Sequence, residues 1–253
     1  MPAAHPEVVG ILGGMGPAAG ADFVRLFVQA CIRRMEAMGL PVHDQGFPEH
    51  WLAQVPVPDR SRALADATPG AHQPLDAMLM ALGRLAALGA RAVAIACNTA
   101  HAWHAPLQQR FPQIELLHMA DETAAHLRQR GVAEAVLLAT QGTYDSGVYD
   151  AALERAGVAC HRPAPAERAA VMQGIYAGVK AGDLALARER FGGVARAVAQ
   201  RHPGSALIMG CTEIPLALPG PAADAAGPLL VDPAEVLAAA LARKAYARVT
   251  SRA

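Results

Sequence analysis

Two short apolar runs that each end in a cysteine constrain the fold of this 253-residue chain most strongly. Residues 92–96 are apolar and stop at Cys97, and residues 206–210 are largely apolar and stop at Cys211. Such runs predict buried strands of a parallel sheet. In an open α/β sheet, ligands bind at the carboxyl ends of the strands, where backbone N–H groups make a nearby thiol a usable base. We therefore expect the two thiols to face one another across a pocket.

Strands alternate with helices along the chain, which is typical of α/β folds with parallel sheets flanked by helices. The strands are expected at residues 8–12, 92–96, 114–119, 135–139, 158–161, 206–210 and 229–231. The helices are expected at residues 18–38, 74–88, 99–110, 121–130, 144–156, 164–181, 183–201 and 233–248, with a turn at residues 140–143. Residues 39–74 are rich in proline and glycine and poorly periodic, so no strand is assigned there.

A weak internal duplication predicts two similar α/β domains. The first half opens with V-V-G-I-L-G-G-M-G-P and a helix, and later contains A-V-A-I-A-C-N-T. The second half opens with A-V-L-L-A-T-Q-G-T and a helix, and later contains A-L-I-M-G-C-T-E. We expect a first domain of residues 1–118 plus 226–253, to which the last helix returns, and a second domain of residues 119–225. The active site is expected in the cleft between them.

The composition argues against several classes of function. The formal net charge is zero, which disfavours general electrostatic binding to nucleic acid or an anionic membrane. Aromatic residues make up 4% of the chain, too few for base-stacking platforms. The four cysteines lack the spacing of a disulfide framework or a structural zinc site, and free thiols suit a reducing cytoplasm. No signal peptide and no apolar stretch of about 20 residues is evident.

Two motifs suggest other ligands. Cys97, His101 and His104 have the i, i+4, i+7 spacing of one helix face, but no fourth zinc ligand is evident, so no metal is expected. Residues 14–19 fit the dinucleotide fingerprint G-x-G-x-x-A after a strand. No clear second strand ending in an acidic residue follows, and a proline would lie where a phosphate must approach. The simpler interpretation is a tight turn that lends N–H groups to a carboxylate, with Met15 near the ligand.

Five motifs resemble those of the aspartate/glutamate racemases, which are cofactor-independent enzymes, and they occur in that family's order. They are G-I-L-G-G-M-G-P at residues 10–17, P-D-R-S at 58–61, C-N-T-A-H at 97–101, L-L-A-T-Q-G-T at 137–143 and G-C-T-E-I-P-L at 210–216. The resemblance covers nearly the whole chain. It implies two domains related by a pseudo-two-fold axis, a homodimer, no cofactor, and two cysteines that act as bases.

The resemblance also implies roles for individual residues. Cys97 and Cys211 match the catalytic thiols, and Arg60 matches an arginine that binds the side-chain carboxylate of aspartate. Lys180 matches a lysine near that distal carboxylate, although a helix end also suits a lysine on electrostatic grounds. The family often has Asn-Pro or Asp-Pro shortly before its P-D-R, whereas this chain has Gln54 followed by valine. That departure bears on substrate choice and makes Gln54 a candidate substrate-binding residue.

The turns next to the cysteines are expected to hold the rest of the substrate. The residues that match those holding the α-carboxylate are Asn98, Thr99 and Thr212. Glu213 is a candidate partner for the Cys211 thiol or for the substrate ammonium. Thr140 and Thr143 either extend the carboxylate cradle or form the turn in which they lie.

Racemisation without a cofactor needs two bases on opposite faces of the α-carbon, one starting as a thiolate and the other as a thiol. Donors must also hold the carboxylate as charge develops on it. The sequence therefore predicts racemisation of an acidic amino acid, aspartate first and glutamate second. The alternatives are a broad-specificity amino-acid racemase, an isomerase or decarboxylase of a small dicarboxylate on the same fold, and a nucleotide- or ligand-binding α/β protein without turnover.

Overall fold

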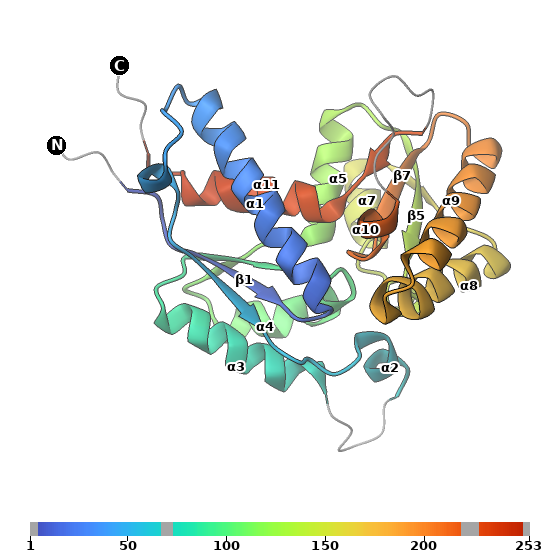
Figure 1. Ribbon diagram of the computed structural model, residues 1–253, viewed down its shortest axis with the longest axis horizontal. Helices are drawn as coiled ribbons and strands as arrows, with labels where there is room; N and C mark the ends of the chain where they lie inside the picture. The colour runs from blue at the N-terminus through green and yellow to red at the C-terminus, as the bar shows by residue number, and fades with distance from the viewer. Residues whose placement is uncertain (1–4, 67–72, 219–227, 250–253) are drawn as a thin grey trace.

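The computed structural model describes residues 5–66, 73–218 and 228–249, and two parallel sheets form its centre (Figure 1). The strands of the first sheet are β1 (Val9–Gly13), β2 (His50–Gln54), β3 (Ala92–Ile95) and β4 (Glu115–Leu116). Those of the second are β5 (Glu134–Ala139), β6 (Ala159–His161), β7 (Ala206–Gly210) and β8 (Leu230–Val231). The spatial orders are β2-β1-β3-β4 and β6-β5-β7-β8, and every pairing is parallel. Both sheets thus have the same topology, which confirms the predicted α/β class with two similar halves.

Helices cover both faces of each sheet. In the first half they are α1 (Pro17–Ala37), α2 (Arg60–Ala65), α3 (Pro74–Ala87) and α4 (His104–Arg110). The second half adds α5 (Met119–Gln129), α6 (Gln141–Ser146), α7 (Asp150–Ala156), α8 (Pro165–Gln173), α9 (Leu184–Arg201) and α10 (Ile214–Ala217). The last helix, α11 (Pro233–Ala245), packs on the first half. Short turns of other helical types are η1 (Asp44–Gly46), η2 (Thr99–Trp103), η3 (Gly174–Gly178) and η4 (Val179–Ala181). Among the described residues, none of these helices has the length and apolar character that crossing a membrane requires.

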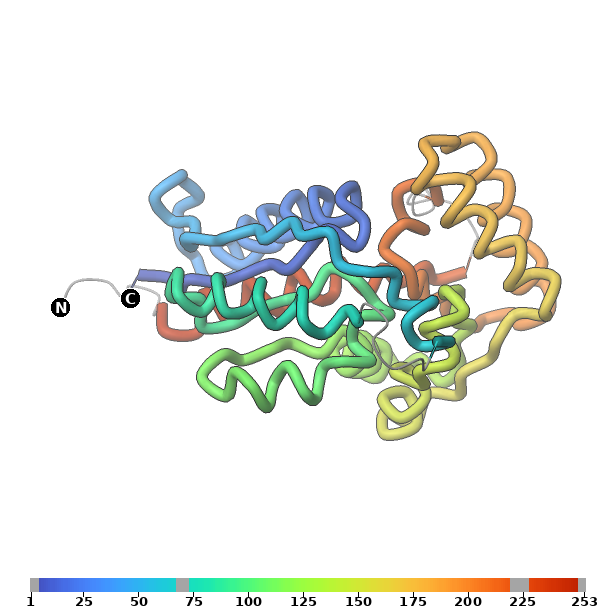
Figure 2. Tube along the Cα trace, turned by 90° about the horizontal axis from the view of Figure 1, so that it is seen from below, coloured from blue at the N-terminus to red at the C-terminus, as the bar shows by residue number. Residues whose placement is uncertain are grey.

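Each sheet separates two apolar cores. In the first half, one core lies under α1 and α11 and the other under α3 and α4. In the second half, one core lies under α5 and α7 and the other under α8 and α9. Figure 2 shows the blue to green elements of the first half on one side and the yellow to orange helices α8 and α9 on the other. Burial on both faces explains why the central strands are continuous apolar runs.

The last helix packs on the first half, whereas the strand before it pairs in the second sheet. Leu237 and Leu241 of α11 lie in one core with Phe23 and Phe27 of α1, and all four side chains are fully buried. In contrast, β8 pairs with β7, so it belongs to the second sheet. The predicted first-domain segment 226–253 therefore needs correction, because its strand hydrogen-bonds to the other half. We propose a boundary between β8 and α11; residue 226 itself lies outside the described residues.

Residues 39–74 contain a strand that the sequence analysis did not assign. β2 lies at the edge of the first sheet, where it pairs only with β1. Its apolar residues Trp51 and Leu52 are 40% and 36% exposed, so the strand lacks the apolar pattern of a buried one. The same segment also forms η1 and α2, while its residues 67–72 lie outside the described part of the chain.

Some predicted helices are interrupted. The helix expected at residues 144–156 is split into α6 and α7, because Gly147 adopts a left-handed φ of 64° that ends α6. Residues 140–143 are the capped first turn of α6 rather than a separate turn. The helix expected at residues 164–181 consists of α8 followed by η3 and η4. Likewise, residues 99–110 form η2 and α4.

Replacing Leu237 by alanine is expected to lower the free energy of unfolding by about 2–5 kcal/mol, because the neighbouring side chains only partly fill the space that is left. Leu88 is 44% exposed, so Leu88→Ala should change the same quantity by no more than about 0.5 kcal/mol. Urea unfolding followed by circular dichroism measures both values. Equal losses in the two variants would contradict the packing of α11 on α1.

Candidate active site

The segments that follow β1, β3, β5 and β7 meet at one pocket between the two halves, here called the strand-end pocket. Its lining residues are Met15, Arg60, Ser61, Cys97, Asn98, Thr99, Thr140, Tyr176, Lys180, Cys211, Thr212 and Glu213. All the site residues predicted from the sequence are in this set except Gln54 and Thr143. Both predicted cysteines contribute to the same pocket, one from each sheet.

Cys97 lies beside a buried cation. The guanidinium of Arg60, the first residue of α2, interacts electrostatically with Cys97, and both residues line the pocket. Its Nη2 donates to the carbonyl oxygen of Met15 at 2.7 Å, and its Nη1 donates to two further backbone carbonyls at 3.1 Å each. Burial acts to lower the pKa of Arg60, but interactions with Cys97, Asp59 and Glu213 raise it above the ordinary value overall. The Cys97 sulfur therefore has a fixed positive charge next to it.

Cys211 has the opposite environment. Its Sγ donates a hydrogen bond to Oε2 of Glu213 at 3.0 Å. Burial, together with the adjacent Glu213 carboxylate, raises the pKa of Cys211 well above its ordinary value. The pocket thus holds one cysteine beside a guanidinium and a second that is a protonated donor. This is the unequal arrangement that acid–base catalysis by two like groups requires at the start of a turnover.

Glu213 connects the second thiol to the first half and to a lysine. The side chain is 3% exposed, and its Oε1 accepts a hydrogen bond from the backbone N–H of Gly16 at 3.1 Å. Lys180 Nζ lies 3.2 Å from the same oxygen. Besides the Cys211 thiol, Oε2 accepts from the hydroxyl of Thr212 at 3.3 Å. A carboxylate this deeply buried needs such partners, because burial without them is costly.

Asn98 is held by a residue that the sequence analysis did not single out. Tyr149, which precedes α7 and is 1% exposed, donates from its hydroxyl to Oδ1 of Asn98 at 2.5 Å. With Oδ1 occupied, the buried Nδ2 of Asn98 has no protein partner among the described residues. That leaves a donor free in the wall of the strand-end pocket.

Three threonine hydroxyls join the two halves behind the pocket. Oγ1 of Thr99 lies 2.9 Å from that of Thr140 and 2.8 Å from that of Thr143, which are themselves 3.0 Å apart. Thr140 also caps α6 by accepting from the backbone N–H of Thr143 at 3.3 Å. Thr99 and Thr140 line the pocket, whereas Thr143 supports them from outside it.

The structure does not bring Gln54 to the strand-end pocket. Its Nε2 donates to the carbonyl oxygen of Pro17 at 2.8 Å, and its side chain packs against Gly13 and Gly20. A Cβ at either glycine would overlap the Gln54 amide. Gln54 therefore fixes the end of β2 against α1. The sequence analysis predicted a contact between Gln54 and the substrate, but the side chain lies against α1 instead.

Two further lining residues, Ser61 and Tyr176, were not proposed as site residues. Ser61 follows Arg60 in α2, and its backbone packs so closely on Gly142 that a Cβ at Gly142 would lie 2.7 Å from the Ser61 Cα. Tyr176 lies in η3 and donates from its hydroxyl to Oδ2 of Asp59 at 3.0 Å. Ser61 could have been found from its place beside the arginine, whereas the sequence around Tyr176 carries no such signal.

His101 supports the backbone at Cys97. Its Nδ1 donates to the carbonyl oxygen of Cys97 at 2.9 Å, and its ring packs against those of His104 and His118. His104 directs Nε2 to the carbonyl oxygen of Leu116 at 2.7 Å. These contacts account for the spacing that suggested a zinc face. Within the described residues, no group of three or more histidine, cysteine or acidic side chains is arranged to hold a metal ion.

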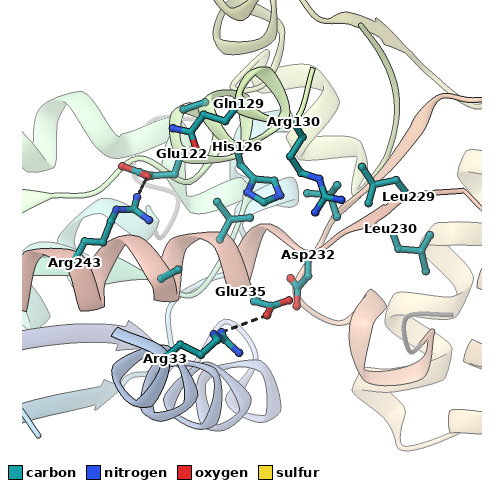
Figure 3. Close-up of a pocket in the computed structure, with 14 residues that line it drawn as sticks. Arg33, Glu122, His126, Gln129, Arg130, Leu229, Leu230, Asp232, Glu235 and Arg243 are labelled. Carbon is teal, nitrogen blue, oxygen red and sulfur yellow. Dashed lines mark hydrogen bonds and ion pairs between the residues drawn. The ribbon is translucent and has the colours of Figure 1, made fainter. Parts of the chain in front are cut away.

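A larger hollow lies elsewhere, between α1, α5, α11 and β8 (Figure 3). Two ion pairs lie in its lining: Arg33 lies 3.3 Å from Glu235, and Arg243 lies 2.8 Å from Glu122. None of the described residues that line it is a cysteine. The two predicted catalytic thiols are both in the strand-end pocket.

The protein is expected to lose stability through His101 as the pH falls from about 6.5 towards about 3. Burial, with the charges of His118 and His104, lowers the pKa of His101 from 6.5 to about 3. Over that range the unfolded chain binds a proton that the folded chain does not, so unfolding becomes more favourable as the pH decreases. His101→Asn keeps a donor for Cys97 and cannot titrate. Its free energy of unfolding, measured in urea at pH 7 and pH 5, should decrease less than that of the native protein; equal decreases would contradict this assignment.

Comparisons with known proteins agree with this fold and indicate a family. The sequence matches the Asp/Glu/Hydantoin racemase family over residues 12–241. The structure of an aspartate racemase from Picrophilus torridus is similar with a TM-score of 0.73 and 30% identity, covering 94% of each chain. An aspartate racemase homologue from Pyrococcus horikoshii OT3 has a TM-score of 0.70 at 21% identity, covering 94% of this chain and 99% of its own, which supports the fold.

A curated relative is the broad specificity amino-acid racemase RacX of Bacillus subtilis (strain 168). It is 27% identical over 150 residues, which are 59% of this chain and 62% of the relative, so the match spans less than two thirds of that protein. The family match, in contrast, covers most of the chain. The chain belongs to the Asp/Glu/Hydantoin racemase family, and its enzyme class is that of the amino-acid racemases.

Proposed function

We propose that this enzyme interconverts the enantiomers of an acidic amino acid, aspartate first and glutamate second, with Cys97 and Cys211 as its two bases. The observation that carries the proposal is the unequal environment of the two thiols. Cys97 lies against the Arg60 guanidinium, whereas Cys211 donates to the Glu213 carboxylate. One cysteine is therefore set up to accept a proton and the other to give one.

In the proposed reaction, the substrate α-carbon lies between the two sulfur atoms. The Cys97 thiolate removes the α-proton from one face, and the electron pair of the C–H bond is delocalised into the α-carboxylate. The Cys211 thiol then delivers its proton to the opposite face. The product is the other enantiomer, with Cys97 now a thiol and Cys211 a thiolate. Both transfers use side chains of this chain, so the proposal requires no cofactor.

Unpartnered donors support the placement of carboxylates in this pocket. Nε of Arg60 and Nδ2 of Asn98 are buried and have no protein partner among the described residues. Buried donors are normally satisfied, so a ligand with acceptor oxygens fits here. We assign the α-carboxylate to Asn98, Thr99 and Thr212, where charge develops in the transition state. The distal carboxylate is assigned to Arg60 and Lys180.

A broad-specificity amino-acid racemase is the second candidate. It is favoured by one contact, the ion pair at 3.2 Å between Lys180 and Glu213, since a paired lysine selects less strongly for an acidic substrate. The RacX relative has that activity in its name. Substrate range therefore separates the two candidates, whereas the use of the two thiols does not.

We further propose that the enzyme is a homodimer, which is what the family resemblance implies, and that it is cytoplasmic. All four cysteines are free, in agreement with a reducing compartment. Sedimentation of the purified protein measures the oligomeric state.

Replacing either catalytic cysteine by serine is expected to lower the racemisation rate by about 10²–10⁴-fold, because general acid–base catalysis contributes that much and serine is a poor base at neutral pH. Cys160→Ser is the matched control: Cys160 is half-buried, lies on β6 and does not line the strand-end pocket. The measurement starts from L-aspartate in D₂O without added cofactor. Early D-aspartate should carry deuterium at the α-carbon while the remaining L-aspartate does not, as expected of two bases.

Retained racemisation in Cys97→Ser or Cys211→Ser would contradict the assignment of the thiols. Deuterium that enters the remaining substrate as fast as the product would point to a single base. Exchange with other amino acids, but with neither aspartate nor glutamate, would keep the mechanism and change the substrate. A complete lack of exchange across such a panel would favour a reaction of small dicarboxylates or ligand binding without turnover.

Tyr149→Phe is expected to lower kcat/KM by up to about 10²-fold, because Asn98 loses the hydroxyl that orients its amide and small displacements of positioning groups are costly. Tyr246→Phe is the matched control, since that buried hydroxyl donates to the carbonyl oxygen of Gly46 at 2.8 Å, away from the pocket. Similar activity losses in the two variants would show a general effect on stability instead.

A further inference from the structure

The lysine assigned to the distal carboxylate already has a carboxylate partner within the protein. Lys180 Nζ lies 3.2 Å from Glu213 Oε1, and that oxygen also accepts the backbone N–H of Gly16 at the start of α1. An ammonium group and a helix-start N–H are the donors that a substrate carboxylate would use. The side chain of Glu213 thus occupies, from within the fold, an anion position next to the substrate.

The ion pair lies where a substrate side chain must pass. Lys180 and Glu213 line the strand-end pocket, and they also line an adjoining hollow formed with residues 14–18 and Arg60. The α-carbon has to lie near the two cysteines, so a longer side chain extends towards this hollow. Its distal group therefore comes close to the paired charges.

Arg60, the second cationic residue of the pocket, also has partners within the protein. Arg60 donates to three backbone carbonyls, and its Nε is without a partner among the described residues. A distal carboxylate consequently has to share Lys180 with Glu213 and lies close to a like charge. The Glu213 side chain is 3% exposed and that of Lys180 is 26% exposed, so moving Lys180 away would leave a buried carboxylate without its cationic partner.

We infer that Glu213 determines substrate specificity by limiting the preference of the enzyme for dicarboxylic over neutral amino acids. The inference rests on the proposed racemisation and concerns only the choice among its substrates. Glu213 offsets part of the charge of Lys180, so the preference for aspartate over an uncharged side chain of similar shape is smaller than an unpaired lysine would give. The native enzyme should therefore turn over both aspartate and asparagine, which have the same size and differ in charge.

The test compares kcat/KM for α-proton exchange with L-aspartate and with L-asparagine in D₂O, and uses their ratio. A substitution that alters Cys211 or the folded fraction changes kcat/KM for both substrates by the same factor, so its effect cancels in the ratio. The ratio therefore reports how much more strongly the enzyme stabilises the transition state of one substrate than that of the other. Glu213→Gln should raise the aspartate-to-asparagine ratio about tenfold, since a freed ammonium makes a charged hydrogen bond to the distal carboxylate. Lys180→Met, which removes the cation, should lower the ratio about tenfold.

The matched control is Glu235→Gln, which makes the same chemical change in the Arg33–Glu235 ion pair on the surface. Its ratio should equal that of the native enzyme. An unchanged or lowered ratio in Glu213→Gln would overturn the inference, as would an unchanged ratio in Lys180→Met or a native enzyme that exchanges aspartate but not asparagine. Exchange with neither substrate would instead overturn the proposed racemisation, on which the inference rests.

Discussion

The hydrogen bonds among Thr99, Thr140 and Thr143 are the contact on which the geometry of the pocket depends. They join the segment after β3 to the segment after β5, at distances of 2.8–3.0 Å. Each sheet already has apolar cores on both faces, so burial alone does not dictate how the two carboxyl edges face one another. A neutral hydrogen bond contributes only about 0.5–1.5 kcal/mol, far less than a core. The three hydroxyls therefore set the orientation of the halves more than their stability.

The buried charges of the site are unfavourable for folding in isolation, and the proposed acid–base chemistry gives them a role. Arg60 and Glu213 are both more than nine-tenths buried, and burial disfavours each charge. Each is compensated by backbone groups and by the other polar residues of the pocket rather than by a direct ion pair between the two. Separating the two charges places the guanidinium beside Cys97 and the carboxylate beside Cys211. Had Arg60 and Glu213 paired directly, the two thiols would have lost the difference between them.

The sequence was most informative where burial is complete. The apolar runs before Cys97 and Cys211 correctly predicted β3 and β7, because a strand covered on both faces must be apolar throughout. The sequence did not predict β2, because the edge position of this strand leaves Trp51 and Leu52 exposed and the strand lacks a buried apolar pattern. Gln54 was misplaced for a related reason: it is close in sequence to Arg60, but the unpredicted strand turns its side chain towards α1.

Contacts between distant residues were beyond what motifs can predict. Asn98 was identified from its place after Cys97, but its partner Tyr149 comes from another helix of the other half, and packing alone brings them together. The same limit applies to Lys180 and Glu213. A motif records that a lysine and a glutamate are present, yet a free lysine attracts a carboxylate and a paired one attracts it much less. The substrate preference proposed for this enzyme therefore rests on which side chains pair in the strand-end pocket, a property of the folded chain rather than of any single motif.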